Sequence, residues 1–272
     1  MSTTIKDVSG TAFVVAEYRA EENREPSPIY QDPVVELFLS DASREAAARV
    51  SSRFPAVKDM VKTRTRYFDD MLDTQIAAGI GQVVILGAGL DTRGVRKRSR
   101  GVRYFEIDDP VTMELKRLCY ANARIDAGVT LIPGNYVTDG LIELLRSNDF
   151  EFDVPTYFIW EGNVMYMPLA IDKQTMGQLK RHVHQFWLSF DYLTESVIAK
   201  STGDASLTAL VESFEAMDAP WVSGIDNIDG LAGEVGLRVV ENMTTGQLYR
   251  KYRGRQASSP IFHHYSICTL ES

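Results

Sequence analysis

The chain has 272 residues, of which 44% are hydrophobic and 24% are charged. Such a chain has enough apolar side chains for a sizeable core, which excludes general disorder, and its length suits one α/β domain with an added cap. The formal net charge is −8, so there is no excess of Lys and Arg to displace counterions from nucleic acid or from an anionic membrane. We therefore expect neither as a partner.

The cysteines and the first residues of the chain bear on the cellular compartment in which we expect the protein. Cys119 and Cys268 lie far apart and form no CxxC pair, so neither a disulfide framework nor a structural zinc site is indicated. No stretch approaches about 18 consecutive apolar residues. The first residues, MSTTIKDVSG, lack a leader in which basic residues precede apolar ones. We expect a cytoplasmic protein.

Helical patterns dominate the first 80 residues, most clearly at 60–79, and short β-rich runs then alternate with helical stretches. This alternation predicts a doubly wound, mostly parallel sheet of the Rossmann-like α/β class. The last two strands lack a long crossover helix between them, so we expect them to pair antiparallel at one edge. We expect residues 1–272 to form one domain, with residues 1–80 as a helical cap over the core of residues 81–272. The predicted strands are 82–87, 102–108, 129–133, 156–161, 185–192, 237–242 and 263–270, and the predicted helices include 110–125, 168–182 and 204–217.

The longest basic cluster is RGVRKRSR at 93–100, between the first two predicted strands. We interpret it as a solvated helix face or a loop. In an acidic chain, one such run does not indicate a nucleic-acid site.

The first predicted strand ends in a glycine-rich turn, VVILGAGLDTR at 83–93. Gly87 and Gly89 permit the tight turn and the close backbone approach that a nucleotide-sized ligand needs. A P-loop is excluded because no Gly-Lys-Ser/Thr follows. The dinucleotide fingerprint would have a third glycine where Thr92 stands, and Asp91 would repel a pyrophosphate at a helix N-terminus. Asp91 is compatible with the sulfonium and ammonium groups of S-adenosylmethionine, or it caps the following helix.

The second predicted strand, RYFEID, ends in Asp108. An acid at this strand end accepts hydrogen bonds from ribose hydroxyls, in adenosyl cofactors and in NAD alike. Glu106 lies on the same face of the strand, because side chains alternate. The spacing therefore favours a nucleotide with a free ribose but does not choose between the two acids.

Five segments of the chain occur in the order GTAFVVAEYRAEENREPSPIYQDPVVELF, RTRYFDD, QVVILGAGLDTRGVR, YFEIDDP and WEGNVMYMP. The series resembles the leucine carboxyl methyltransferase family, in its bacterial branch that includes polyketide O-methyltransferases of the tetracenomycin type. The resemblance runs from about residue 10 to residue 170 and more loosely to the end. It implies a class I methyltransferase fold and S-adenosylmethionine as cofactor.

The resemblance implies that an arginine of RTRYFDD clamps the methionine carboxylate of the cofactor, as suits a guanidinium fork. Arg64 is the first choice and Arg66 the second. Each arginine has an alternative role, in an ion pair across one helical turn, and for Arg66 with Asp70 we favour that role.

The remaining cofactor positions are also implied by the resemblance. Gly87 lies under the cofactor, and Asp108 matches the ribose-binding acid. Glu161, at the end of strand TYFIWE, matches the acid that faces the cofactor's amino group, although it also suits a strand-end acid that takes backbone hydrogen bonds. The family's adenine-reading Asp-Leu is replaced here by Asn135 and Tyr136. The Asn135 carbonyl can still accept from the adenine amino group.

Methyl transfer from a sulfonium is an in-line displacement that requires alignment above all. A carboxylate acceptor is already ionised at pH 7, whereas a phenol gains from a general base. The candidates for a base are Tyr166 and either His263 or His264, at most one of which points into the site if they begin the last strand. No histidine has acidic partners at ligand spacing, so we expect no metal site.

We expect Tyr18, Arg19 and Tyr166 to contact the acceptor, together with a substrate-cap insertion near 200–225. The apolar stretch FEAMDAPWVSGI suits a hydrophobic small molecule. The sequence thus predicts an O-methyltransferase that acts on a carboxylate or a hydroxyl of such a molecule. Three alternatives stay open, namely a nicotinamide-dependent oxidoreductase, a protein C-terminal carboxyl methyltransferase and a non-catalytic binding protein. The oligomeric state is not indicated.

Overall fold

The computed structural model describes residues 9–272, and its seven strands form one sheet in the order β3-β2-β1-β4-β5-β7-β6. Strands β1 to β5 pair in parallel, and β7 runs antiparallel between β5 and β6. The predicted fold class and all seven strands are confirmed, with strand ends shifted by one or two residues. The strands are β1 (Gln82–Leu86), β2 (Arg103–Asp108), β3 (Val129–Pro133), β4 (Thr156–Trp160), β5 (Phe186–Leu193), β6 (Arg238–Thr244) and β7 (Tyr265–Glu271).

The central strands β1 and β4 are buried along their whole length. Their sequences, QVVIL and TYFIW, are nearly continuous apolar runs, as expected where helices cover both faces of a parallel sheet. Val84 of β1 lies opposite Phe105 of β2 on one side and Phe158 of β4 on the other. All three side chains belong to one apolar cluster, so the core sits directly beneath the strand ends that would carry a site.

The strand order reverses at β1. The chain passes from β1 to β2 and β3 on one side and then returns to β4 and β5 on the other. The loops that leave the carboxyl ends of β1 and β4 therefore diverge, which opens a crevice at this switch point.

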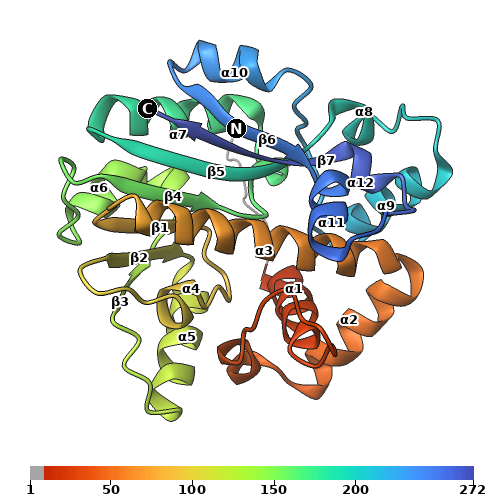
Figure 1. Ribbon diagram of the computed structural model, residues 1–272, viewed down its shortest axis with the longest axis horizontal. Helices are drawn as coiled ribbons and strands as arrows, with labels where there is room; N and C mark the ends of the chain where they lie inside the picture. Colours follow the sequence, from red (N-terminus) through yellow and green to blue (C-terminus); the bar gives the residue numbers. More distant parts are fainter. Residues whose placement is uncertain (1–8) are drawn as a thin grey trace.

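The N-terminal helices are α1 (Ser9–Glu22), η1 (Val34–Phe38), α2 (Asp41–Arg53) and α3 (Pro55–Ala77). Helix α3 begins at Pro55, whose fixed φ and missing N–H suit a first helical turn. Figure 1 shows α3 crossing the face of the sheet, with α1 and α2 grouped beyond one end of the strands. Helix α3 also packs against α11 near the other end of the chain.

The predicted helices 110–125, 168–182 and 204–217 correspond to α5, α7 and α9. Among residues 9–272, no helix combines the length and apolarity that crossing a bilayer requires. The helices after β1 are α4 (Arg93–Arg96), α5 (Pro110–Asn122), η2 (Tyr136–Gly140), α6 (Leu141–Arg146), η3 (Val164–Tyr166), α7 (Leu169–His182), α8 (Glu195–Ile198), α9 (Ala205–Ala216), α10 (Ile228–Glu234), α11 (Thr245–Arg253) and α12 (Ile261–His264).

Candidate functional site

A cavity of about 840 Å³ lies outside the carboxyl ends of β1, β2 and β4. Its polar wall comes from the loops that follow these strands, and its apolar wall comes from α1, α2, α3 and α9. The crevice of an open α/β sheet is the expected ligand site. Eleven residues singled out from the sequence line it: Tyr18, Arg19, Arg64, Gly87, Gly89, Asp91, Asp108, Asn135, Tyr136, Glu161 and Tyr166.

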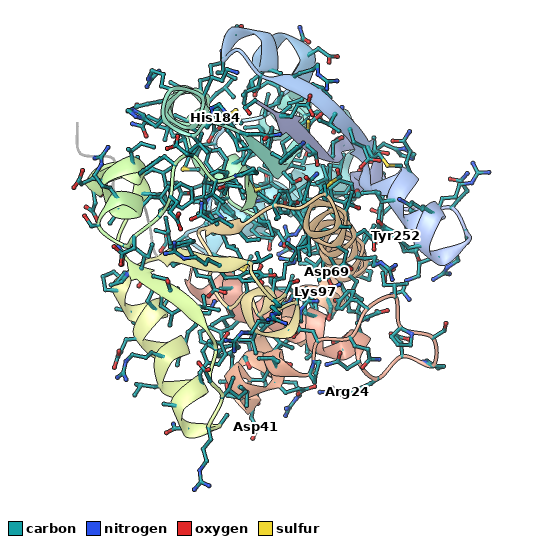
Figure 2. All side chains as sticks on the ribbon, turned by 60° about the vertical axis from the view of Figure 1, so that its left-hand side comes forward. Arg24, Asp41, Asp69, Lys97, His184 and Tyr252 are labelled. Carbon is teal, nitrogen blue, oxygen red and sulfur yellow. The ribbon has the colours of Figure 1, made fainter. Side chains whose placement is uncertain are left out.

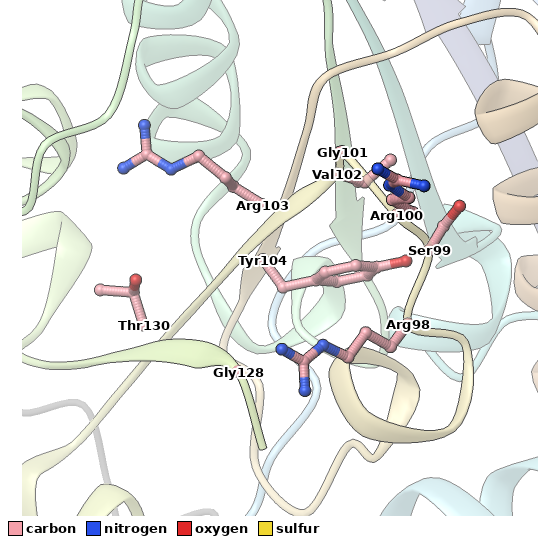
Figure 3. A pocket seen from close by; sticks show the side chains of 9 residues that line it. All are labelled: Arg98, Ser99, Arg100, Gly101, Val102, Arg103, Tyr104, Gly128 and Thr130. Carbon is pink, nitrogen blue, oxygen red and sulfur yellow. The ribbon is translucent and has the colours of Figure 1, made fainter. Parts of the chain in front are cut away.

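A second hollow, of about 660 Å³, lies at the amino ends of β2 and β3. Figure 3 shows Arg98, Arg100 and Arg103 around Tyr104 at this place. Arg103 pairs with Glu151 over 2.7 Å. This hollow is at the opposite end of the strands from the switch point, so we take the larger cavity as the candidate site.

The turn after β1 has the left-handed backbone that favours glycine, with φ of 61° at Gly87 and 46° at Gly89. A Cβ on Gly87 would overlap the side-chain amide of Asn163. That amide donates from Nδ2 to the Glu161 carbonyl at 2.8 Å and to the carbonyls of Leu86 and Gly87 at 3.3 Å. Gly87 is therefore required by the packing of Asn163 as well as by its place in the cavity wall, and sequence reasoning missed Asn163.

Asp108 is oriented by the turn itself. The Gly89 N–H donates to Asp108 Oδ2 at 2.5 Å, and the Asp109 N–H donates to Oδ1 at 2.7 Å. Burial raises the pKa of Asp108 to about 6. Glu106, the alternative acid, is fully buried against Lys116 and does not line the cavity. The spacing in the sequence does not choose between Asp108 and Glu106, whereas in the structure Asp108 lines the cavity and Glu106 does not.

Asp91 lies at the start of α4 and lines the cavity. Its Oδ1 accepts from the Arg93 N–H at 2.7 Å. Burial alone would raise the pKa of Asp91, but Arg93, Arg19 and Lys116 outweigh burial and hold that pKa well below its usual range. Asp91 is therefore an anion under working conditions.

Arg93 corrects the expectation of a solvated basic cluster at 93–100. Its side chain is only 2% exposed and donates to Asp69 at 2.8 Å, to Glu161 at 2.7 Å and to the Thr65 carbonyl at 3.2 Å. It also pairs with Asp91. Asp69 and Arg93 both belong to segments that carry the family resemblance, RTRYFDD and QVVILGAGLDTRGVR, and this was the available signal in the sequence. A run of basic residues by itself does not distinguish a buried arginine from a solvated one.

Arg64 and Glu161 are direct partners in the cavity wall. Arg64 donates from Nε to Glu161 at 2.8 Å and from Nη1 to Asp191 at 3.0 Å and to Tyr265 Oη at 2.7 Å. Tyr265 in turn donates to Asp191, whose Oδ1 accepts from the Gly162 N–H at 2.6 Å. Burial raises the pKa of Asp191, while Arg64 opposes that rise. Sequence reasoning missed Asp191 and Tyr265, which approach Arg64 only through the fold.

Arg66, the second choice for the clamp, lies outside the cavity lining. It donates to Asp70 at 2.7 Å and to the Ile29 carbonyl, and its guanidinium lies 5.5 Å from the ring centroid of Tyr252. The ion pair across one helical turn that we favoured for Arg66 is present. Of the two arginines, Arg64 is the one at the candidate site.

The two candidate catalytic histidines are not at the site, which corrects the prediction for His263 and His264. The last strand begins at Tyr265, and both histidines belong to α12. His263 is exposed, and His264 Nδ1 lies 3.0 Å from the Thr194 hydroxyl. Neither lines the cavity. The last strand begins two residues later than the sequence predicts, and Tyr265, its first residue, lines the cavity.

Asn135 caps the short helix η2. Its Oδ1 accepts from the N–H groups of Val137 at 2.9 Å and Thr138 at 3.3 Å. The carbonyl to which the sequence assigned an adenine contact thus already accepts two backbone bonds. The Tyr136 hydroxyl accepts from Trp160 Nε1 at 2.9 Å, which fixes the ring in the wall.

Arg19 joins α1 to the glycine-rich turn. It pairs with Asp32 and donates to the Leu90 carbonyl at 2.9 Å and to Thr92 Oγ1 at 2.8 Å. These bonds engage all three nitrogens of the guanidinium, so Arg19 holds the N-terminal helices on the turn. Arg19 also lines the cavity, and its contact with an acceptor stays a prediction. The Tyr18 hydroxyl donates to the Ala47 carbonyl at 3.0 Å, which leaves its ring as an apolar wall.

The segment that was expected near 200–225 contributes to the apolar wall. The rings of Phe214 and Trp221 stack with centroids 4.4 Å apart, and both line the cavity with Met217 and the half-buried Tyr166. Offset stacking of this kind holds two large rings as one surface. The wall therefore suits an apolar or aromatic ligand.

No metal centre is found in the described part of the chain, since residues 9–272 contain no group of three or more His, Cys, Asp or Glu placed to hold an ion. Figure 2 shows Arg24 and Asp41 among the N-terminal helices at one end of the molecule and His184 at the other. His184 does not line the cavity.

The leucine carboxyl methyltransferase family profile matches residues 12–180 of the chain. A protein of Mycolicibacterium gilvum, provisionally named an S-adenosyl-L-methionine-dependent methyltransferase, is 32% identical over 200 residues, which are 63% of each chain. A protein of Mycobacterium marinum with the same provisional name is 30% identical over 251 residues, 83% of this chain and 76% of that one. The alignment with the Mycolicibacterium gilvum protein thus spans a little under two thirds of that relative's length.

Two solved structures share the fold. A provisionally named methyltransferase of Thermobifida fusca superposes with a TM-score of 0.62 at 17% identity, over 88% of this chain and 93% of that one. A DUF574 family protein of Streptomyces avermitilis superposes with a TM-score of 0.62 at 12% identity, over 94% and 96%. With the strand order, the glycine-rich turn and the family profile in agreement, this chain belongs to the leucine carboxyl methyltransferase family and has the class I S-adenosylmethionine-dependent methyltransferase fold.

Proposed function

We propose that the protein is an S-adenosylmethionine-dependent O-methyltransferase whose acceptor is a carboxylate or a hydroxyl of a hydrophobic small molecule. The observation that carries the proposal is one continuous cavity with a charged wall at the strand ends and an apolar wall from α1, α2 and α9. A cofactor and an apolar acceptor need such a pair of surfaces side by side. In this proposal the chain is one domain, with residues 1–80 as the cap and residues near 200–225 as the substrate cap.

The charged wall fits the cofactor's polar groups. Among the described residues, two backbone N–H groups donate to the half-buried Asp108, so its carboxylate has lone pairs left for ribose hydroxyls. Glu161 and Asp91 bring carboxylates to the wall for an ammonium group. The bonds found for Arg64 among the described residues use Nε and Nη1, so Nη2 is left to donate to a carboxylate. Asn135 and Tyr136, which the proposal assigns to adenine, line the cavity, and the Asn135 amide has Nδ2 to donate. When bound, the cofactor supplies an electrophilic methyl group on its sulfonium.

The chain's own residues favour a carboxylate acceptor. The described cavity wall contains tyrosines but no histidine. Burial raises the pKa of Tyr166, and it raises that of Tyr265 further, so neither hydroxyl is ionised near neutral pH. A carboxylate needs no base because it is already ionised at pH 7. Methyl ester formation is therefore the reaction that these side chains support best, and alignment and exclusion of water are the protein's contribution.

The test uses S-adenosylmethionine labelled in the methyl group and a panel of aromatic and aliphatic carboxylic acids and phenols. Methyl esters release volatile labelled methanol on mild alkaline hydrolysis, whereas methyl ethers do not. We expect label in an alkali-labile product and none with Asp108→Ala. Tyr166→Phe should reduce the rate by about tenfold or less, because losing a true general base costs about 10²–10⁴-fold. An alkali-stable product, or a loss above a hundredfold with Tyr166→Phe, would contradict ester formation.

A further inference from the structure

One face of α2 gives the mouth of the cavity an unexpected charge. Ala46, Arg49, Val50 and Arg53 all line the cavity, and their spacing places them on one face of the helix. Two of these four side chains are small and apolar, as suits the wall of an apolar cavity. The other two are arginines, although the chain as a whole carries a net charge of −8.

The charges of these two arginines are weakly compensated within the described part of the chain. Arg53 is exposed, and the contact found for it there is with the ring of Phe54, 5.1 Å from the guanidinium carbon. Arg49 approaches Glu45 only at 3.9 Å. The cavity's inner arginine, Arg64, differs because two carboxylates already neutralise it. The positive potential at the rim is thus left for a ligand.

Helix α2 packs against α1 and α3, whereas the charged wall is formed by the loops after the strands. A group bound by Arg49 and Arg53 is therefore held by a different layer of the molecule from the residues around the cofactor position. The same cavity is also lined by Tyr18, by Val50 and by the stacked rings of Phe214 and Trp221. One cavity thus combines a cation pair, an apolar surface and a polar end.

We propose that Arg49 and Arg53 bind an acidic group of the acceptor, distinct from the oxygen that is methylated. This inference rests on the proposed function and narrows its substrate class to amphipathic acids with a second reactive oxygen, such as hydroxy acids or diacids with an apolar body. A guanidinium pair suits a carboxylate or a sulfonate because each arginine presents a planar fork of donors. The pair also draws anions toward the mouth against the repulsion of the whole molecule.

The test compares two dyes with the same apolar body. Anilinonaphthalene sulfonate carries an anionic group, and phenylnaphthylamine is its uncharged parent. We expect Arg53→Gln and Arg49→Gln each to raise the Kd of the sulfonate dye about three- to tenfold, the range between an exposed ion pair and a charge-assisted hydrogen bond. The Kd of the uncharged dye should change less than about twofold, since its burial is unaffected. Added salt should weaken only the sulfonate dye, because it screens charge.

Arg44→Gln is the matched control, because Arg44 lies on the same helix, pairs with Asp41 at 2.7 Å and does not line the cavity. It should leave both dyes unchanged. Val50→Phe places a larger side chain in the apolar wall between the two arginines. It should raise the Kd of both dyes, which would show that both bind in this cavity. The proposal is overturned if Arg49→Gln and Arg53→Gln behave like Arg44→Gln, or if Val50→Phe affects neither dye. Calorimetry with S-adenosylmethionine on the same proteins tests the proposed function separately. If the cofactor does not bind, the dye titrations still show whether Arg49 and Arg53 bind an anionic group.

Discussion

Arg93 donates from Nη1 to Glu161 Oε2 over 2.7 Å, so the residue that opens α4 is bonded to the residue that follows β4. The other oxygen of Glu161 accepts from Arg64 at 2.8 Å. The two loops that diverge at the switch point are thus joined by one carboxylate between two buried guanidinium groups. This cluster shapes the polar wall before any ligand arrives.

Arg93→Ala should lower the free energy of unfolding by about 3–5 kcal/mol, because removing one partner of a buried ion pair leaves the other charges uncompensated. Asp69, Asp91 and Glu161 would all lose a cation. Arg66→Ala is the control, since its pair with Asp70 is half-exposed and worth about 1 kcal/mol or less. Urea unfolding at pH 7 measures both variants. Similar small losses for the two would show that Arg93 is not structural.

Gly87→Ala should reduce both stability and cofactor affinity. Its φ of 61° is unfavourable for alanine, and the new Cβ would displace Asn163 from its carbonyl partners. Removing the obstacle in Gly87→Ala/Asn163→Ala should restore part of the stability lost in Gly87→Ala, as residues in contact do not behave additively. Thermal unfolding of the two single variants and the double variant measures this coupling. Strict additivity would contradict the contact.

Asp108→Ala should weaken S-adenosylmethionine binding by about 1.5–3 kcal/mol, the value expected when charge-assisted hydrogen bonds to a ligand are lost. Glu106→Gln is the matched acid on the same strand, and it should change stability through Lys116 while leaving affinity nearly intact. Calorimetry on folded variants decides between them. Equal affinity in wild type and Asp108→Ala would contradict the ribose role of Asp108.

Affinity for the cofactor should also depend on pH through Asp108. Burial raises its pKa to about 6, and only the ionised carboxylate accepts hydrogen bonds from both ribose hydroxyls through its two oxygens. Binding should therefore weaken as the pH falls through about 6 and level off above it. A series of titrations from pH 5 to pH 8 measures the profile. An affinity that does not change over this range would contradict the assignment.

Asp172 should make the protein less stable at high pH. It is fully buried on α7, neither side-chain oxygen has a partner among the described residues, and burial raises its pKa to about 8. The folded chain keeps this proton up to about pH 8 whereas the unfolded chain releases it near its ordinary pKa of 3.8, so the free energy of unfolding falls as pH rises between these values.

Asp172→Leu removes that dependence. It should raise the free energy of unfolding by about 1–3 kcal/mol at pH 8, the usual cost of an unsatisfied buried polar group, and by less at pH 5. Urea unfolding at the two pH values measures the difference. A gain that is the same at both, or a loss at pH 8, would show that the carboxyl is not held protonated.

The parts of the fold that were predicted correctly have local signals. The strands β1 and β4 are uninterrupted apolar runs, and the turn at Gly87 and Gly89 is marked by residue type. The end of the chain was less well predicted, because a four-residue helix at Ile261–His264 has too few residues for a periodic pattern. Because β7 begins at Tyr265 and not at His263, neither His263 nor His264 lies at the site.

The side-chain partners were the least predictable part of the site. Arg64 meets Asp191 and Tyr265 from 127 and 201 residues away, and such pairs depend on strand order rather than on local pattern. Asn163, in the loop after β4, likewise packs against Gly87, in the turn after β1, so closely that it leaves no room for a Cβ. Residue types at strand ends indicated where a ligand would lie, but not which charges would already be neutralised there.

The most direct measurement is calorimetric titration of the folded protein with S-adenosylmethionine and, in parallel, with NADH. The glycine-rich turn and Asp108 would serve either cofactor, so this comparison tests the central claim without knowledge of the acceptor. Saturable binding of S-adenosylmethionine that is weakened in Asp108→Ala, with no binding of NADH, is the expected result. Binding of NADH in its place, or no heat with S-adenosylmethionine at pH 7, would contradict the proposal that this cavity belongs to a methyltransferase.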